Sequence, residues 1–270
     1  VTGGPGTGKT TAVAGLLALL AEQAEYAGQR RPRVALTAPT GKAAARLAAA
    51  VAEAREALPP EDRARVDPPQ ASTLHRLLGH RGHAHTRFRH DAGNRLPHDV
   101  VVVDETSMVS LTMMARLLEA LRPETRLVLV GDPDQLASVE AGAVLADLVA
   151  GLRTLDPQAV TRLRTVHRFG GAIGELASAV RAGLADDALA VLRAGSAEVA
   201  WLDPDDPAAL EQVRRLALST ATSLQSAALA GDIAGALTAL ERHRLLCAHR
   251  EGPAGAGHWN RQVERWLAEA

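Results

Sequence analysis

The chain has 270 residues, of which 47% are hydrophobic, and its 30 basic and 31 acidic side chains leave a formal net charge of −1. This balance excludes the strong overall basic charge of many nucleic-acid binders, although a local basic groove remains open. The single cysteine, Cys247, excludes an internal disulfide framework and is typical of a reducing compartment. No apolar run has the length of a membrane span, so we expect a cytoplasmic protein.

The N-terminal segment fits the phosphate-binding loop pattern: a glycine, any four residues, then Gly-Lys and Ser or Thr. Glycines let successive backbone N–H groups curl around an anion, and the helix that begins near Lys9 points its positive end at the same phosphates. Lys9 is expected to reach the β- and γ-phosphates of ATP, and the Thr10 hydroxyl to ligate Mg²⁺. The expected ATP-binding residues are Gly3, Gly4, Pro5, Gly6, Thr7, Gly8, Lys9, Thr10 and Thr11.

Short apolar runs alternate with helical stretches through residues 1–168. This alternation predicts an α/β fold in which crossover helices join a mostly parallel sheet. The expected strands, besides a short stretch at Val1, are residues 34–38, 100–103, 127–130 and, less clearly, 159–163. The expected helices are residues 11–24, 41–57 and 110–121, and the polar residues 80–94 are expected to form an exposed excursion.

The pattern changes after Phe169, which predicts a domain boundary near Arg168. Residues 1–168 are then a first domain and residues 169–270 part of a second. In this second part we expect helices at residues 173–182, 186–193 and 208–240, and a final helix that carries Trp259 and Trp266. Residues 199–202 and 245–248 are candidate strands of a second sheet.

Two acids follow the most apolar of the expected strands, residues 100–103. Four successive valines predict a buried strand, and ligands bind at the carboxyl ends of the strands in a parallel sheet. Asp104 is therefore expected to hold Mg²⁺ opposite Thr10, and Glu105 to orient and deprotonate the attacking water. The alternative is an acidic pair that caps the next helix. The phosphate loop upstream disfavours that alternative.

Gln135 follows the next expected strand, within the segment Gly-Asp-Pro-Asp-Gln at 131–135. Its carboxamide is both a donor and an acceptor, so it can contact a γ-phosphate or the attacking water. It can thereby report whether that phosphate is present. The alternative is that Asp132, Pro133 and Asp134 simply form a turn, which the local pattern alone favours.

Two further segments carry small, hydroxyl or imidazole side chains, and the first of them follows an expected strand and opens a helix. They are Pro39-Thr40-Gly41 and the segment that contains Thr73 and His75. Because ATP has its own loop, the expected occupant is the backbone of single-stranded DNA. Simple helix N-caps would explain both segments equally well.

Arg168 lies in the segment His-Arg-Phe at 167–169, at the expected domain boundary. An arginine there can project into the nucleotide site as an arginine finger. Its spacing alone also fits an ordinary surface arginine.

Six motifs follow one another: Gly-Gly-Pro-Gly-Thr-Gly-Lys-Thr-Thr at 3–11, Ala-Pro-Thr-Gly-Lys-Ala-Ala at 38–44, Ser-Thr-Leu-His-Arg-Leu-Leu at 72–78, Val-Val-Asp-Glu-Thr-Ser-Met at 102–108, Gly-Asp-Pro-Asp-Gln-Leu-Ala-Ser-Val-Glu-Ala-Gly at 131–142 and His-Arg-Phe at 167–169. In this order they resemble superfamily 1 helicases of the 5′→3′ branch and, more narrowly, the RecD family, the alpha subunits of exodeoxyribonuclease V. A later segment at 246–253, with Trp259 and Asn260, is also similar to that family.

The resemblance implies a RecA-like P-loop motor domain at 1–168, part of a second motor domain, and ATP-driven translocation on single-stranded DNA. It also implies RecB and RecC as partners, and a role in double-strand-break repair and recombination. The roles it implies are catalysis for Lys9, Glu105, Gln135 and Arg168, metal binding for Thr10 and Asp104, and DNA contact for Pro39, Thr40, Gly41, Thr73 and His75.

The sequence departs from the family pattern at three segments: the adenine-recognising segment before the loop, a late Ser-Gln-Gly-type segment and the second arginine finger. With a start at Val1 rather than Met, these departures predict a fragment that does not unwind DNA by itself. Two alternatives stay open. One is a stand-alone helicase of the RecD2 type, and the other is a nucleotide-binding scaffold subunit, which an intact Glu105 and Arg168 disfavour.

Overall fold

The computed structural model describes residues 1–79, 88–135, 144–165 and 170–269. The chain forms two compact units, Val1–Ala188 and Leu189–Ala270. The division into motor domains at residue 168 stays a prediction.

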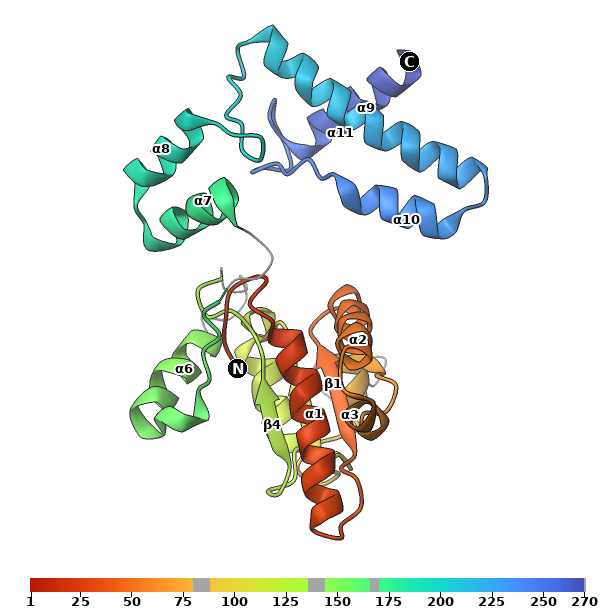
Figure 1. The fold of residues 1–270 in the computed structure, drawn as a ribbon, viewed down its shortest axis with the longest axis vertical. Helices are drawn as coiled ribbons and strands as arrows, with labels where there is room; N and C mark the ends of the chain where they lie inside the picture. The colour runs from red at the N-terminus through yellow and green to blue at the C-terminus, as the bar shows by residue number, and fades with distance from the viewer. Residues whose placement is uncertain (80–87, 136–143, 166–169, 270) are drawn as a thin grey trace. The chain divides into compact units, whose positions relative to one another are not determined.

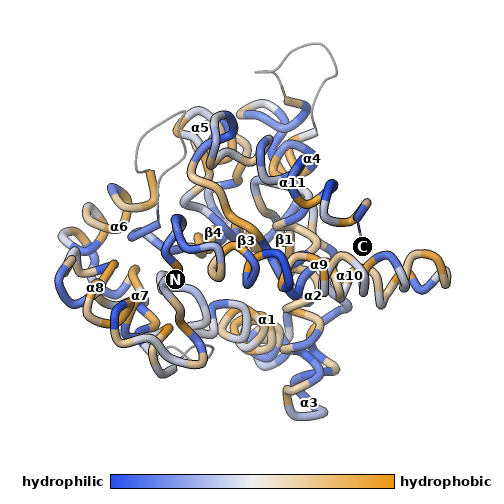
Figure 2. Tube along the Cα trace, turned by 90° about the horizontal axis from the view of Figure 1, so that it is seen from above, coloured by the Kyte–Doolittle hydropathy of each residue, from blue (hydrophilic) through white to orange (hydrophobic). Residues whose placement is uncertain are grey.

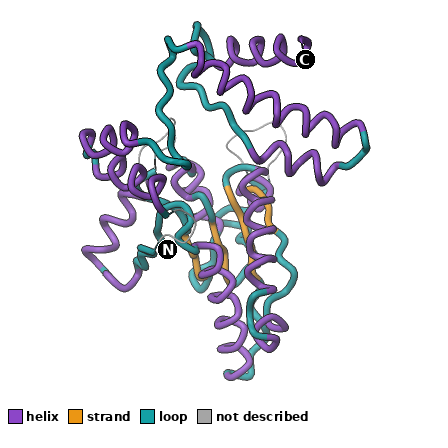
Figure 3. The backbone as a smooth tube through the Cα atoms, turned by 45° about the horizontal axis from the view of Figure 1, so that its top comes forward, coloured by secondary structure: helices purple, strands orange, loops and turns teal. Residues whose placement is uncertain are grey.

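The first unit contains a parallel sheet of four strands in the order β2-β1-β3-β4 (Figures 1 and 3). The strands are β1 (Val34–Ala38), β2 (Ala71–Thr73), β3 (Val100–Val103) and β4 (Arg126–Leu129). The predicted α/β fold with a parallel sheet is confirmed, and β1 and β3 have the predicted bounds. The three-residue strand β2 is too short to stand out as a pattern in the sequence.

Helices cover both faces of this sheet, as the view along the strands shows (Figure 2). On one face lie α1 (Lys9–Tyr26) and α2 (Gly41–Glu56), with α3 (Pro60–Arg65) beside them. The other face carries α4 (Leu74–Leu78) and α5 (Leu111–Ala120). The 3₁₀ turn η1 (Thr106–Met108), α6 (Val144–Leu155) and the 3₁₀ turn η2 (Pro157–Ala159) complete the surroundings of the sheet.

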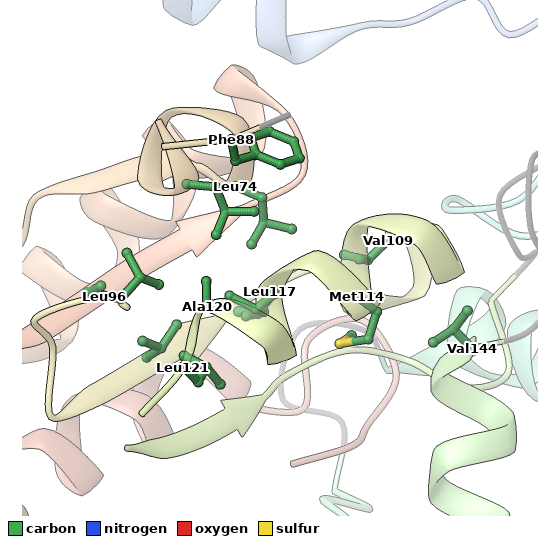
Figure 4. Packing of buried hydrophobic residues seen from close by; sticks show 13 residues of the cluster. Leu74, Phe88, Leu96, Val109, Met114, Leu117, Ala120, Leu121 and Val144 are labelled. Atoms are coloured by element: carbon green, nitrogen blue, oxygen red, sulfur yellow. The ribbon is translucent and has the colours of Figure 1, made fainter. Parts of the chain in front are cut away.

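The valines of β3 divide the core between these two helical layers. Val100 and Val102 pack with residues of α1 and α2, whereas Val101 and Val103 pack with α4 and α5. Figure 4 shows Leu74 of α4 and Met114 and Leu117 of α5 in the second of these clusters. Successive side chains of a strand point to opposite faces, so four consecutive valines fill both cores at once. All four are buried, which fixes the carboxyl end of β3 firmly in place.

The residues before the phosphate loop pair with the far side of β4. The Val1 amino group donates to the Leu129 carbonyl at 2.8 Å, and Thr2 forms isolated parallel bridges with Gly131 and Arg162. The Thr2 N–H also donates to the Thr161 carbonyl at 2.8 Å. The fourth expected strand, at 159–163, is thus an isolated bridge at this edge, after η2.

The regular secondary structure of described residues 170–269 is helical, with loops between the helices (Figure 3). They are α7 (Gly171–Ala182), α8 (Ala185–Ala194), α9 (Pro207–Leu229), α10 (Ile233–Arg242) and α11 (Ala256–Glu269). The strands expected at 199–202 and 245–248 are wrong, because these described residues form no strand. The helix expected at 208–240 is interrupted at Gly231, whose φ of 72° is left-handed, and Asp232 caps the new helix by accepting from the Gly235 N–H.

Leu117 offers a test of the core. It is fully buried in the layer that contains α5, whereas its neighbour Leu118 is 52% exposed. We expect Leu117→Ala to lower the free energy of unfolding by about 2–5 kcal/mol, because it leaves a cavity. Leu118→Ala is the matched control and should change it by less than about 0.5 kcal/mol. Urea denaturation of both variants measures the difference, and equal losses would contradict the packing.

Candidate nucleotide site

The phosphate loop has the backbone that its sequence demands. Gly6 and Gly8 adopt φ values of 73° and 80°, in the left-handed region that side chains other than glycine rarely occupy. The Thr7 hydroxyl donates to the Gly4 carbonyl at 2.8 Å and closes the loop on itself. The helix α1 then begins at Lys9, so its free N–H groups face the mouth of the loop.

Lys9 extends over this loop. Its Nζ donates to the carbonyl oxygens of Gly3 at 2.7 Å and of Gly4 at 3.0 Å. The ammonium group therefore lies at the loop mouth, where the sequence places the β- and γ-phosphates. Thr10 and Thr11 occupy the first turn of α1, and Thr10 is partly buried.

The acidic pair lies at the carboxyl end of β3. Burial raises the pKa of Asp104, against smaller opposing effects of the Glu105 backbone N–H and of Lys9. Burial also raises the pKa of Glu105, and the neighbouring charge of Asp104 raises it further. Because Lys9 acts on both carboxylates, the loop and the acidic pair share one electrostatic environment. A raised pKa suits a carboxylate that accepts a proton from water.

Glu105 has a strained backbone. Its φ of 49° and ψ of 40° are left-handed, and it is the one non-glycine residue with positive φ in the described ranges. Such a conformation costs about 1–3 kcal/mol and is concentrated at functional sites. The strained residue lies between Asp104 and η1, and the charge of Asp104 acts on the Glu105 carboxylate.

Gln135 is held by a residue that the sequence interpretation gave no role. The Ser107 hydroxyl, in η1, donates to Gln135 Oε1 at 2.8 Å. Ser107 is buried and Gln135 is exposed, and this partly buried hydrogen bond links the segment after β3 to the segment after β4. Ser107 lies only two residues after Glu105, but nothing in the local pattern indicates its partner 28 residues along the chain.

The donors present fit Mg²⁺. Thr10 and Asp104 supply a hydroxyl and a carboxylate, the hard oxygen ligands that Mg²⁺ prefers, and Mg²⁺ commonly takes its remaining ligands from water and phosphate. In the described part of the chain no group of three or more His, Cys, Asp or Glu side chains could hold a metal by itself.

A cavity of about 310 Å³ opens beside the loop. Gly3, Gly4 and Thr7 form one wall. The other walls come from the segment after β4, the segment after η2 and the last turn of α7, through Asp132, Pro133, Asp134, Arg162, Leu163, Arg164 and Arg181. The cavity thus combines the phosphate loop with three arginines from distant parts of the chain.

The segments expected to contact DNA lie side by side at the same edge of the sheet. Ala38 at the end of β1 is in register with Thr73 at the end of β2. The Thr40 hydroxyl accepts from the Ala43 N–H and the Thr73 hydroxyl accepts from the Arg76 N–H, each at 3.2 Å, so both threonines are helix N-caps. The capping interpretation is therefore confirmed, and DNA contact stays a prediction.

Other expected residues complete this surface or lie outside the description. Pro39 is partly buried, Gly41 and His75 are exposed, and the His75 ring meets the Phe88 ring edge-on at 5.9 Å between centroids. Arg168 lies outside the described residues, as do residues 80–87 of the expected excursion. Cys247 is a partly buried free thiol.

The comparisons with known proteins agree with this geometry. A family model described as an AAA domain matches residues 1–141. The chain belongs to the AAA domain family. It is 64% identical over 269 residues to the RecBCD enzyme subunit RecD of Mycolicibacterium smegmatis, and the match covers all of this chain and 48% of that protein. The resemblance to the RecD family is thus confirmed, and the chain spans about half the length of this relative.

Two further matches are more distant. An ATP-dependent RecD2 DNA helicase of Deinococcus radiodurans is 40% identical over 155 residues, covering 57% of this chain and 18% of that protein. A chain from a solved structure of DNA unwinding by Pif1 helicases has a TM-score of 0.38 and 21% identity, over 67% of this chain and 43% of that chain. No helix in the described part of the chain is long and apolar enough to cross a membrane.

The raised pKa of Asp104 predicts a pH-dependent stability. Because the pKa of Asp104 is raised in the folded state, its contribution to the free energy of unfolding is favourable at low pH. That contribution is lost as the pH rises through the raised pKa. Asp104→Asn is therefore expected to unfold with a higher free energy than the wild type at pH 7, and with an equal one near about pH 3, where the carboxyl is protonated. Denaturant titrations at both pH values measure this.

Asp67, which is exposed, provides the matched control. Asp67→Asn should leave the difference in the free energy of unfolding between the two pH values the same as in the wild type. If Asp104→Asn destabilises the protein at pH 7, the carboxylate contributes to the fold rather than opposing it, and its assignment to metal binding loses support.

Proposed function

We propose that this chain is the ATP-binding part of an ATP-dependent 5′→3′ single-stranded-DNA translocase and helicase. The observation that carries the proposal is that Lys9, Asp104 and Glu105 share one electrostatic environment, with Gln135 bonded to Ser107 beside them. Phosphoryl transfer needs this combination of cationic loop, metal acid, base and γ-phosphate contact.

Each side chain then has a separate task. The loop N–H groups and Lys9 bind and orient the phosphates, and Thr10 and Asp104 hold Mg²⁺, which neutralises charge on the phosphate oxygens. Glu105 takes the proton of the attacking water, for which its raised pKa is suited. Gln135 contacts the γ-phosphate, and Arg168 acts as an arginine finger.

The identity with RecD subunits supports a place in a RecBCD-type enzyme. In this proposal RecB and RecC are the partner subunits, and double-strand-break repair and recombination, in the cytoplasm, is the process. A second candidate is a stand-alone helicase, which the match to the RecD2 DNA helicase supports over a smaller part of the chain. Co-purification of the full-length protein with RecB and RecC distinguishes the two.

Single-stranded DNA would cross the carboxyl ends of β1 and β2. Thr40 and Thr73 use their hydroxyl oxygens to cap helices, so phosphate contact there depends on backbone N–H groups and on neighbouring side chains. Lys42 and Arg76 are exposed within these two helix starts and add positive charge despite the net charge of −1. His75, which directly precedes Arg76, is also exposed.

Paired substitutions at Lys9 and Glu105 test the catalytic assignment. Lys9→Ala is expected to abolish DNA-stimulated ATP hydrolysis in the full-length protein, since several kcal/mol of charge stabilisation are lost. Glu105→Gln should also lower turnover by at least about a hundredfold, because it removes the base. It should retain ATP affinity, since Asp104 and the loop are intact. Turnover and nucleotide affinity are measured together for both variants.

Two results would contradict these roles. Near-normal turnover in Lys9→Ala would show that the loop does not serve hydrolysis. A joint collapse of affinity and turnover in Glu105→Gln would make Glu105 a structural residue instead of a base.

Lys42 and Arg76 allow a test of the DNA surface that leaves the two helix caps intact. The double substitution to Ala should weaken binding of single-stranded DNA and reduce the slope of log affinity against log salt by about 1.4, two phosphate contacts at about 0.7 each. Titration of a labelled oligonucleotide at several salt concentrations measures the slope. The matched control is the double substitution of Arg116 and Arg153, exposed on α5 and α6. Equal slopes in both variants would exclude this surface.

A further inference from the structure

One arginine of the cavity beside the loop stands apart from the other two. Arg181 comes from the last turn of α7, and its guanidinium lies directly over Gly4. The approach is so close that a Cβ atom at position 4 would overlap Arg181 NH2 and lie 3.0 Å from NH1. Glycine at this position therefore admits a cation to the surface of the phosphate loop.

The protein partner of Arg181 is a weak one. The NH2 group lies 3.8 Å from Asp132 Oδ2, near the limit for an ion pair, and the arginine side chain is 43% exposed. Asp132 is buried and uses its other oxygen, Oδ1, to accept from the Asp134 N–H at 3.1 Å. At 3.8 Å and with the arginine exposed, this ion pair leaves the guanidinium free to turn toward a better anion, while Asp132 keeps its hydrogen bond from the Asp134 N–H.

Gly4 lies between two cations. Lys9 Nζ donates to the Gly4 carbonyl at 3.0 Å, and Arg181 covers the α-carbon of the same residue. Both cations therefore contact the same residue of the phosphate loop. The planar fork of a guanidinium matches two oxygens of a phosphate, a geometry that the single ammonium of Lys9 does not offer.

We propose that Arg181 exchanges Asp132 for the terminal phosphate of a nucleoside triphosphate, and so distinguishes a triphosphate from a diphosphate. The proposal rests on the proposed function, since it deepens the role of the same loop. A diphosphate lacks the group that Arg181 contacts and leaves the arginine with Asp132. Because Arg181 belongs to α7, the exchange also makes the partner of this helix's last turn depend on whether the terminal phosphate is bound.

The test compares two nucleotides in the full-length protein: a non-hydrolysable ATP analogue and ADP. Arg181→Ala is expected to weaken the analogue about tenfold, the value of one charge-assisted contact, and to change ADP affinity less than about twofold. Arg181→Lys should lie between, because it keeps the charge and loses the fork. Arg193→Ala, an exposed arginine on α8, should match the wild type for both nucleotides.

A second substitution is expected to change the affinity for the analogue in the opposite direction. It keeps the test valid even if the arginine variants fold poorly. Asp132→Asn takes away the competing carboxylate and should tighten the analogue relative to ADP. Equal losses for both nucleotides in Arg181→Ala, or an unchanged affinity ratio in both Arg181→Ala and Asp132→Asn, overturn the inference.

Lys9→Ala separates this failure from that of the proposed function. If Lys9→Ala loses nucleotide affinity while Arg181→Ala leaves the ratio unchanged, only the role of Arg181 is wrong. If Lys9→Ala keeps both affinities and near-normal turnover, the loop is not the nucleotide site and both proposals fall.

Discussion

The site depends on β4, which joins its two halves through backbone hydrogen bonds. On one side, the Gly131 N–H donates to the Val1 carbonyl and the Gly3 N–H donates to the Gly131 carbonyl, each at 3.2 Å. On the other side, the Val130 N–H donates to the Val103 carbonyl at 2.8 Å. The phosphate loop and the acidic pair are thereby held two strand spacings apart, roughly 10 Å.

The same rigidity explains how the protein tolerates an unfavourable site. Asp104 and Glu105 have raised pKa values because they are partly buried, and Glu105 also has a strained backbone. Both features oppose folding, the strain by about 1–3 kcal/mol. The two hydrophobic layers that pack against β3 on opposite faces offset these losses of folding free energy. The two acids therefore follow a strand whose four residues are all buried, where the backbone has little freedom to relax.

Local patterns in the sequence predicted the parts of the fold that are locally determined. Four successive valines specify β3 within the bounds observed, and the spacing of glycines before Lys9 specifies the loop and the start of α1. The same reasoning failed at 199–202 and 245–248, where short apolar runs occur without neighbouring strands to pair with. A β-strand needs a neighbouring strand to pair with, and a short apolar run in the sequence does not show whether such a neighbour exists.

The remaining features of the site depend on contacts between distant segments. Ser107 and Gln135 are each unremarkable in their local pattern, and only the pairing of β3 with β4 brings them together. The position of Arg181 over Gly4 likewise follows from where α7 ends. By contrast, the cap roles of Thr40 and Thr73 were among the expected alternatives, because capping is a local interaction.

The hydrogen bond from Ser107 sets the polarity of the Gln135 side chain. Because Oε1 accepts the hydroxyl proton, the carboxamide is oriented with its amino group on the other side. An amino group can only donate, so the free end of Gln135 is matched to an electron-rich oxygen and mismatched to a cation. The buried Ser107 thus fixes which end of the Gln135 carboxamide is free, and that end is a hydrogen-bond donor.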